Sequence, residues 1–191
     1  MEKIAIIGSA GAGKTTLAQK LYSILNIKVV HLDRLFWQPG WKEKPRDTRI
    51  EIMENLVQEK QWIIEGTYLG SSESRLNAAD TVIFLDIAPS FCLWRIIKRH
   101  RDYHGCSRRD LKEGCKDKPN PIRILKVLVF PIRGRRTLKK KLRNYESKQI
   151  IRLRSSKEVE DFLVQLRQDV NDQRDLFHEQ THLQISEFAT T

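Results

Sequence analysis

Short apolar runs alternate with amphipathic segments along most of the chain. Continuous apolar runs at residues 3–7, 28–32, 62–64, 81–85 and 149–153 are typical of buried strands. Between them, apolar side chains three and four residues apart predict helices at residues 14–25, from 48 to about 57, 89–100 and 155–167. Strands that alternate with helices predict an α/β fold with a parallel sheet.

Polar residues mark helix starts and the segments between the predicted helices and strands. Thr48 with Glu51, and Ser155 with Glu158, have the spacing of capping boxes at helix starts. Residues 33–45 read as a loop rich in aromatic residues and proline, and residues 102–121 as a polar, basic lid. Two basic helical stretches follow, split near residues 131–134. We expect one domain over residues 1–167 and a polar tail over 168–191.

The loop after the first apolar run carries the most specific motif. Residues 8–15 read G-S-A-G-A-G-K-T and fit G-x-x-x-x-G-K-[ST] at every fixed position, between a predicted strand and a predicted helix. In such a P-loop the backbone N–H groups wrap a phosphate, the lysine reaches the β- and γ-phosphates and the hydroxyl meets Mg²⁺. A turn that is glycine-rich by accident would not explain this context. We predict binding of ATP and Mg²⁺ through Gly8, Ser9, Ala10, Gly11, Ala12, Gly13, Lys14, Thr15 and Thr16.

Three acidic residues directly follow apolar runs: Asp33, Glu65 and Asp86. In a parallel sheet these strand ends line the ligand crevice. A carboxylate there can hold Mg²⁺, directly or through water, or accept a proton from an attacking hydroxyl. A helix cap or turn is the alternative for any one of them. We predict a metal role for Glu65 and Asp86 beside Thr15, and a catalytic role for Asp33.

Basic residues concentrate in one stretch. The chain has a net charge of +11, and residues 95–143 hold 18 Lys and Arg against 4 Asp and Glu. Arg95 and Arg99 share a helix face, and Arg101, Arg108 and Arg109 continue into the predicted lid. Guanidinium groups that close over phosphates stabilise a phosphoryl transition state. A solvated basic face is the alternative. We predict nucleotide contacts for Arg95 and catalytic roles for Lys14, Arg99 and Arg108.

Other features of the sequence concern the aromatic residues, the cysteines and the cellular compartment. Phe36, Trp37 and Trp41 beside Asp33 predict either a stacking surface for a ring or a small aromatic core. The cysteines at 92, 106 and 115 have no metal or disulfide spacing, and no apolar run reaches the ~20 residues of a membrane span. With no signal peptide, the sequence predicts a cytoplasmic protein.

Several of these segments together resemble a known family. The P-loop through Thr16, the run H-L-D-R-L-F-W-Q-P-G-W at 31–41, W-I-I-E-G-T-Y at 62–68, and Y-H-G at 103–105 with Arg108 and Asp110 are similar to bacterial DNA topology modulation proteins. Those are P-loop proteins related to adenylate kinases. The resemblance covers about residues 3–162.

The resemblance implies a nucleotide-kinase fold, with a five-stranded parallel sheet, helices on both faces and a lid. It implies that Asp33 meets the phosphoryl acceptor and that Glu65 and Gly66 lie near Mg²⁺. It places Arg95 and Arg99 on the adenine and the phosphates. Arg75 is only a loose counterpart of the acceptor-site arginine of adenylate kinases.

The leading hypothesis is an ATP-dependent kinase whose acceptor is a nucleoside, a nucleotide or a similar small molecule. The alternative is an ATP-binding regulator that associates with nucleic acid and has no kinase activity. The basic stretch supports the alternative, although the sequence shows no DNA-reading module and predicts at most weak nucleic-acid binding. A GTPase is disfavoured because no N-K-x-D-type segment appears.

Overall fold

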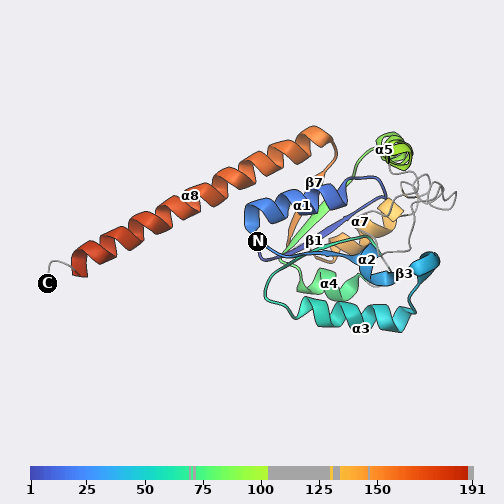
Figure 1. Ribbon diagram of the computed structural model, residues 1–191, viewed down its shortest axis with the longest axis horizontal. Helices are drawn as coiled ribbons and strands as arrows, with labels where there is room; N and C mark the ends of the chain where they lie inside the picture. Colours follow the sequence, from blue (N-terminus) through green and yellow to red (C-terminus); the bar gives the residue numbers. More distant parts are fainter. Residues whose placement is uncertain (69, 71, 103–129, 131–133, 146, 189–191) are drawn as a thin grey trace.

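The computed structural model describes the chain apart from residues 69, 71, 103–129, 131–133, 146 and 189–191. It is a three-layer α/β structure in which helices cover both faces of a central sheet (Figure 1). One long helix projects from this body toward the C-terminus. No helix among the described residues is long and apolar enough to cross a membrane.

The sheet has five strands in the order β2-β5-β1-β6-β7, and every neighbouring pair is parallel. Its strands are β1 (Lys3–Gly8), β2 (Val29–His31), β5 (Trp62–Glu65), β6 (Thr81–Leu85) and β7 (Gln149–Leu153). The central strands are buried on both faces, which explains their continuous apolar sequences. The predicted five-stranded parallel sheet is confirmed.

Successive residues of β1 point to opposite faces and build two cores. Ile4 and Ile6 pack into one core with α1 (Lys14–Leu25), with Cys92 of α5 (Pro89–Asp102) and with the first half of α8 (Ser156–Phe188). Ala5 and Ile7 pack into the other core. Its helical members come from α2 (Leu32–Phe36), α3 (Arg46–Val57), α4 (Glu73–Ala78) and α7 (Arg135–Arg143).

Helix α8 begins as predicted and ends much later. The Ser155 hydroxyl accepts a hydrogen bond from the Glu158 N–H at 3.1 Å, and the Glu158 carboxylate accepts one from the Arg154 N–H at 2.9 Å. Leu163 and Leu166 are buried against the core. The helix, expected to end near residue 167, continues to Phe188 and leaves the body (Figure 1). The predicted polar tail is therefore helical over most of its length.

The segment between β2 and β5 differs from the prediction. Residues 33–45 are not one loop: they contain most of α2, then the antiparallel pair β3 (Trp37–Gln38) and β4 (Lys42–Glu43), which flank a short 3₁₀ turn, η1 (Pro39–Trp41). Helix α3 starts at Arg46, so the predicted capping box at Thr48 and Glu51 is wrong. Helix α4 was not predicted. The predicted lid at 102–121, apart from its first residue, and the first basic helical stretch lie outside the described residues.

Candidate active site

The P-loop joins β1 to α1 at the carboxyl edge of the sheet. Gly11 has a φ of 77°, and a Cβ there would stand 2.4 Å from the Cys92 carbonyl oxygen, so only glycine fits. Gly13, with a φ of 99°, is the N-cap of α1, and no described side chain caps the helix. The N–H groups at the start of α1 are thereby left for an anion.

Two side chains of the loop fit a phosphate ligand. The Lys14 ammonium donates to the carbonyl oxygens of Gly8 at 3.2 Å and Ser9 at 3.0 Å, so it lies over the loop. The Ser9 hydroxyl oxygen is buried and has no hydrogen-bond partner among the described residues. A buried polar group of this kind calls for a ligand or solvent partner. The donor-rich cradle therefore suits the phosphates of a nucleotide.

Arg95 of α5 lies against the same loop. Its Nη1 donates to the Ala12 carbonyl at 3.1 Å, and its Nη2 donates to the Ser156 hydroxyl at 2.9 Å. A Cβ on Gly13 would stand 3.3 Å from Nη1. Arg95, midway along α5, thus joins the P-loop to the start of α8, beside the predicted nucleotide.

Glu65, at the end of β5, lies next to the P-loop helix. Its Oε1 accepts a hydrogen bond from the Thr15 hydroxyl at 3.1 Å and lies 3.0 Å from Nδ1 of His31. Burial raises the pKa of the Glu65 carboxyl, but the His31 hydrogen bond, the Lys14 charge and the Thr15 hydrogen bond together lower it below its usual value. An ionised carboxylate beside a hydroxyl is an oxygen donor set of the kind that Mg²⁺ prefers.

Sequence reasoning did not single out His31. Its position follows from strand pairing, because His31 is the register partner of Glu65 across β2 and β5. The signal available in the sequence was its place at the end of a strand, two residues before Asp33.

Asp33 lies in α2, just past β2. Its Oδ1 accepts a hydrogen bond from the Tyr68 hydroxyl at 2.7 Å. Burial first, and then the charge of Asp33, raise the pKa of Tyr68 far above its usual value. Tyr68 was not among the predicted site residues. Phe36, from the aromatic cluster, is fully buried in the core, which supports a packing role for that residue.

Asp86, the third strand-end acid, has cationic partners. Its side chain is buried, and its Oδ2 accepts hydrogen bonds from Nη2 of Arg135 at 2.7 Å and from Nε of Arg152 at 2.7 Å. The structure brings Glu65 to Thr15 and joins Asp86 to these arginines. A metal role for Asp86 stays a prediction.

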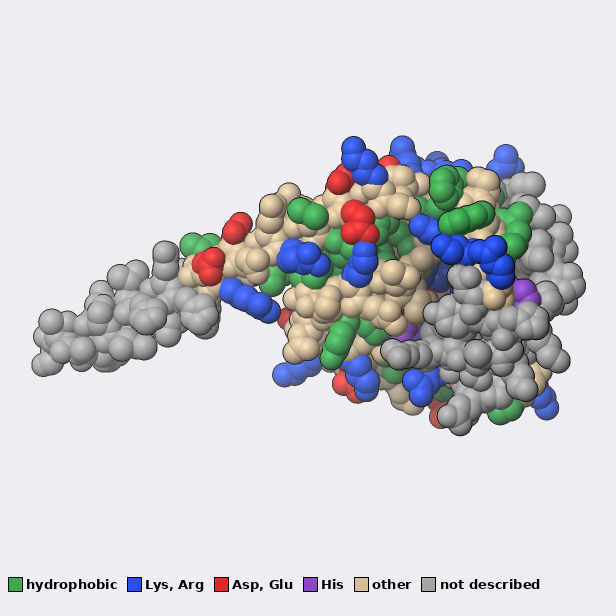
Figure 2. All heavy atoms as spheres, turned by 45° about the horizontal axis from the view of Figure 1, so that its top comes forward, with side chains coloured by type: hydrophobic (Ala, Val, Ile, Leu, Met, Phe, Trp, Pro, Cys, Tyr) green, Lys and Arg blue, Asp and Glu red, His purple; other side chains and the backbone are tan. Residues whose placement is uncertain are grey.

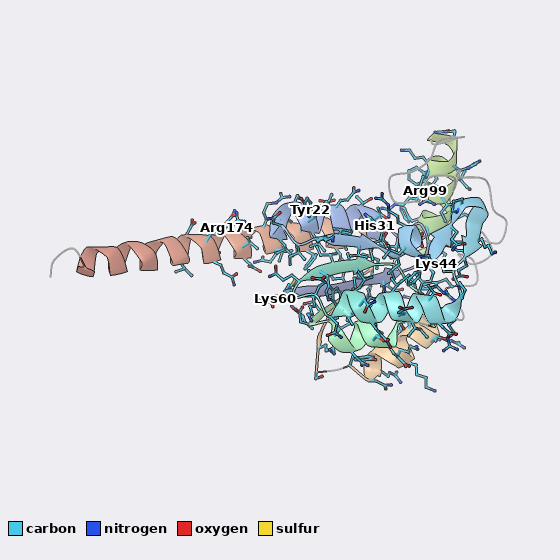
Figure 3. All side chains as sticks on the ribbon, turned by 60° about the horizontal axis from the view of Figure 1, so that its bottom comes forward. Tyr22, His31, Lys44, Lys60, Arg99 and Arg174 are labelled. Atoms are coloured by element: carbon cyan, nitrogen blue, oxygen red, sulfur yellow. The ribbon has the colours of Figure 1, made fainter. Side chains whose placement is uncertain are left out.

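The other predicted residues are distributed around this centre. Thr16 is exposed on α1, and Arg99 is half-buried on α5. Figure 3 shows His31 toward the end of the molecule where α5 carries Arg99, whereas Lys60 lies away from that end. Arg108 lies outside the described residues.

Arg75 of α4 is fully buried behind the site. Its Nη2 donates to the Thr67 carbonyl at 3.2 Å, and its Nε and Nη1 have no hydrogen-bond partner within the described part of the chain. Burial lowers the pKa of the guanidinium to about 10, against the opposing effect of the Glu65 charge. The Thr67 hydroxyl in turn accepts from the Gly8 N–H at 3.2 Å and donates to the Gly8 carbonyl. Arg75 therefore supports the segment that carries Glu65.

The central strand, the P-loop that follows it and the helices on both faces define the class of fold: a P-loop NTPase fold of the nucleotide-kinase-like kind. Two solved structures agree. Shikimate kinase from Bacteroides thetaiotaomicron is 16% identical, with a TM-score of 0.51, and the match covers 88% of this chain and 97% of that one. Shikimate kinase from Acinetobacter baumannii in complex with shikimate is 14% identical, with a TM-score of 0.56, over 91% and 94%.

At such low identity these similarities establish the fold alone. No protein-family model matches the chain, and no curated protein matches it. The resemblance to DNA topology modulation proteins therefore stays a prediction.

Proposed function

We propose that this protein is an ATP-dependent phosphotransferase that acts on a small acceptor carrying a hydroxyl group. The observation that carries the proposal is the juxtaposition of three features at one sheet edge. The P-loop follows β1, Glu65 ends β5, and Asp33 follows β2, and these strands are neighbours in the order β2-β5-β1. A phosphate cradle, an oxygen site for Mg²⁺ and a carboxylate are the parts that phosphoryl transfer needs.

In the proposed reaction the P-loop N–H groups and Lys14 hold the phosphates of ATP. Thr15 and Glu65 would hold Mg²⁺, which would supply positive charge beside the phosphates. Arg95, against the loop, adds positive charge on the nucleotide side, and we expect Arg99 and Arg108 to act on the transferring phosphoryl group.

Asp33 acts on the acceptor. The acceptor oxygen forms a bond to the γ-phosphorus, and the bond from that phosphorus to the β–γ bridging oxygen breaks, releasing ADP. The hydroxyl proton passes to the Asp33 carboxylate. A small hydroxylated acceptor also agrees with one of the two structural neighbours, a kinase in complex with shikimate.

The test is a screen of hydroxylated metabolites, nucleosides and nucleotides with Mg·ATP, read as ADP release. The parent is compared with Asp33→Asn and with Asp161→Asn, which removes an exposed carboxylate on α8. Asp33→Asn should lower turnover ~10²–10⁴-fold, because losing a general base typically has this effect. Asp161→Asn should match the parent.

Either of the following results would contradict the proposal. One is a parent that fails to bind Mg·ATP in calorimetry. The other is an Asp33→Asn variant whose turnover equals that of the parent.

A further inference from the structure

Two segments meet where the proposed acceptor acid lies. One is α2, which carries Asp33 and Phe36; the other is residues 65–68, which carry Glu65 at one end and Tyr68 at the other. They are distant in sequence, and the pairing of β2 with β5 brings them together. Gly66 lies against Leu32 of α2, and Tyr68 makes the polar contact with Asp33.

Tyr68 is fixed at both ends of its side chain. Its hydroxyl donates to Oδ1 of Asp33 at 2.7 Å, with the two residues 35 positions apart. Its ring meets the ring of Phe36 edge-on, with the centroids 4.8 Å apart and the planes at 84°. Phe36 is fully buried, so the aromatic ring of Tyr68 rests on a rigid part of the core.

The backbone of Tyr68 is held in a costly conformation. Its φ is 27°, in the positive region that residues with a side chain rarely adopt. Such conformations persist where the surroundings fix them, and they cluster at functional sites. Here the preceding residue, Thr67, is bonded through its hydroxyl to both the N–H and the carbonyl of Gly8, and its own carbonyl is bonded by Arg75.

Tyr68 itself is suited to donating a hydrogen bond and not to accepting a proton. Burial and the neighbouring Asp33 charge raise the pKa of its hydroxyl, so the phenol stays protonated at neutral pH. The single proton of the Tyr68 hydroxyl is donated to Oδ1 of Asp33, so the second carboxylate oxygen, Oδ2, receives no hydrogen bond from Tyr68.

We infer that Tyr68 is a positioning residue: it fixes the Asp33 carboxylate through Oδ1, presents Oδ2 to the acceptor hydroxyl, and through Thr67 ties that carboxylate to the first glycine of the P-loop. The inference rests on the proposed phosphotransferase function. It gives the acceptor side and the nucleotide side of the site one continuous connection, Asp33–Tyr68–Thr67–Gly8. Near-attack geometry depends on connections of this kind, because a small misplacement of the base lowers the rate of the reaction strongly.

The test compares Tyr68→Phe with the matched control Tyr22→Phe, which changes a half-exposed tyrosine on α1 (Figure 3). Tyr68→Phe keeps the ring and its packing on Phe36, and it removes only the hydroxyl. Turnover of Mg·ATP is measured with the acceptor found in the screen, and also with water as the acceptor in slow hydrolysis. We expect kcat to fall about 10-fold, which corresponds to about 1.4 kcal/mol. The KM for ATP and the calorimetric affinity for Mg·ATP should not change, and Tyr22→Phe should match the parent.

A double-variant cycle separates positioning from stability. If Tyr68 acts through Asp33, then Asp33→Asn with Tyr68→Phe should be no slower than Asp33→Asn alone, within about 2-fold. Effects that multiply in the double variant would overturn the inference, as would a Tyr68→Phe variant with the parental kcat. Unchanged Mg·ATP binding by Tyr68→Phe shows that the variant is folded.

The inference and the proposed function fail in different ways. If the parent binds Mg·ATP but turns it over with neither water nor any acceptor, both the proposed function and the role of Tyr68 are rejected. A parent that is active, with an inactive Asp33→Asn and an unaffected Tyr68→Phe, removes only the role of Tyr68.

Discussion

At the scale of single residues, Lys14 gives the sharpest test of nucleotide binding. Its ammonium lies over the P-loop, hydrogen-bonded to the carbonyls of Gly8 and Ser9, so a phosphate can replace these neutral partners easily. Lys14→Ala should weaken Mg·ATP binding about 10- to 100-fold, since a charge-assisted hydrogen bond contributes about 1.5–3 kcal/mol. The measurement is isothermal calorimetry.

The control for this variant is Lys60→Ala. Lys60 is exposed and precedes β5, so it lies at the opposite edge of the sheet from the P-loop (Figure 3). Its affinity for Mg·ATP should equal that of the parent, and neither variant should change the melting temperature by more than about 2 °C. Equal ATP affinity of Lys14→Ala and the parent would mean that the P-loop does not hold the phosphates.

Residues differ in how visible they are in a sequence. The P-loop residues were found because their spacing is local and fixed, and Asp33 and Glu65 were found because they directly follow apolar runs. His31 and Tyr68 were missed because their contacts depend on the register of β2 against β5 and on a positive φ. Neither the strand register nor the positive φ can be read from a local pattern of residues.

At the scale of elements, helices and strands with a regular apolar pattern were predictable from the sequence, and helices without one were not. The bounds of α1, β6 and β7 agree with the sequence, since each has a clear apolar face or run. Helix α3 starts at Arg46, directly after Pro45, and no side-chain hydrogen bond caps its first turn, so Thr48 is not its N-cap. Helix α4 has only 6 residues, too few to show a helical period.

Helix α8 combines a packed half with a projecting half. Leu163 and Leu166 are buried, whereas residues 171–176 are all exposed. Ending the chain after Asn171 should therefore change the free energy of unfolding by less than about 0.5 kcal/mol, or about 1–2 °C in melting temperature. Thermal unfolding and calorimetric Mg·ATP binding would check this.

Leu166→Ala is the matched control for the packed half. It should cost about 2–5 kcal/mol, because it leaves a cavity between α8 and the core. A truncation as destabilising as Leu166→Ala would show that the second half of α8 supports the fold.

At the scale of the whole molecule, the surface charge determines whether the protein binds nucleic acid. The described part of the basic stretch lies mainly in the second half of α5 and in α7. Figure 2 shows apolar and basic side chains mixed at the end of the body away from the projecting helix. On α5, Phe91, Trp94 and Ile97 are exposed, and the Lys98 ammonium lies 5.2 Å from the centre of the Trp94 ring. Such a surface attracts polyanions without reading sequence.

The last prediction separates a kinase from a nucleic-acid binder by removing the same charge from two places. Arg99→Ala with Arg108→Ala changes predicted catalytic residues, whereas Lys139→Ala with Lys140→Ala removes two exposed cations of α7 from the same stretch. If DNA binding is only electrostatic, each pair of substitutions should reduce the slope of log DNA affinity against log salt by about 0.9 for every phosphate that is no longer neutralised. The parent's DNA binding should vanish near physiological salt.

Turnover should fall only in the arginine pair, by about 100-fold or more, because guanidinium groups stabilise the transferring phosphoryl. Fluorescence anisotropy with duplex DNA across a salt series, alongside ADP release, measures both. Tight DNA binding at physiological salt that the arginine pair abolishes, with turnover unchanged, would favour the regulator and reject the kinase.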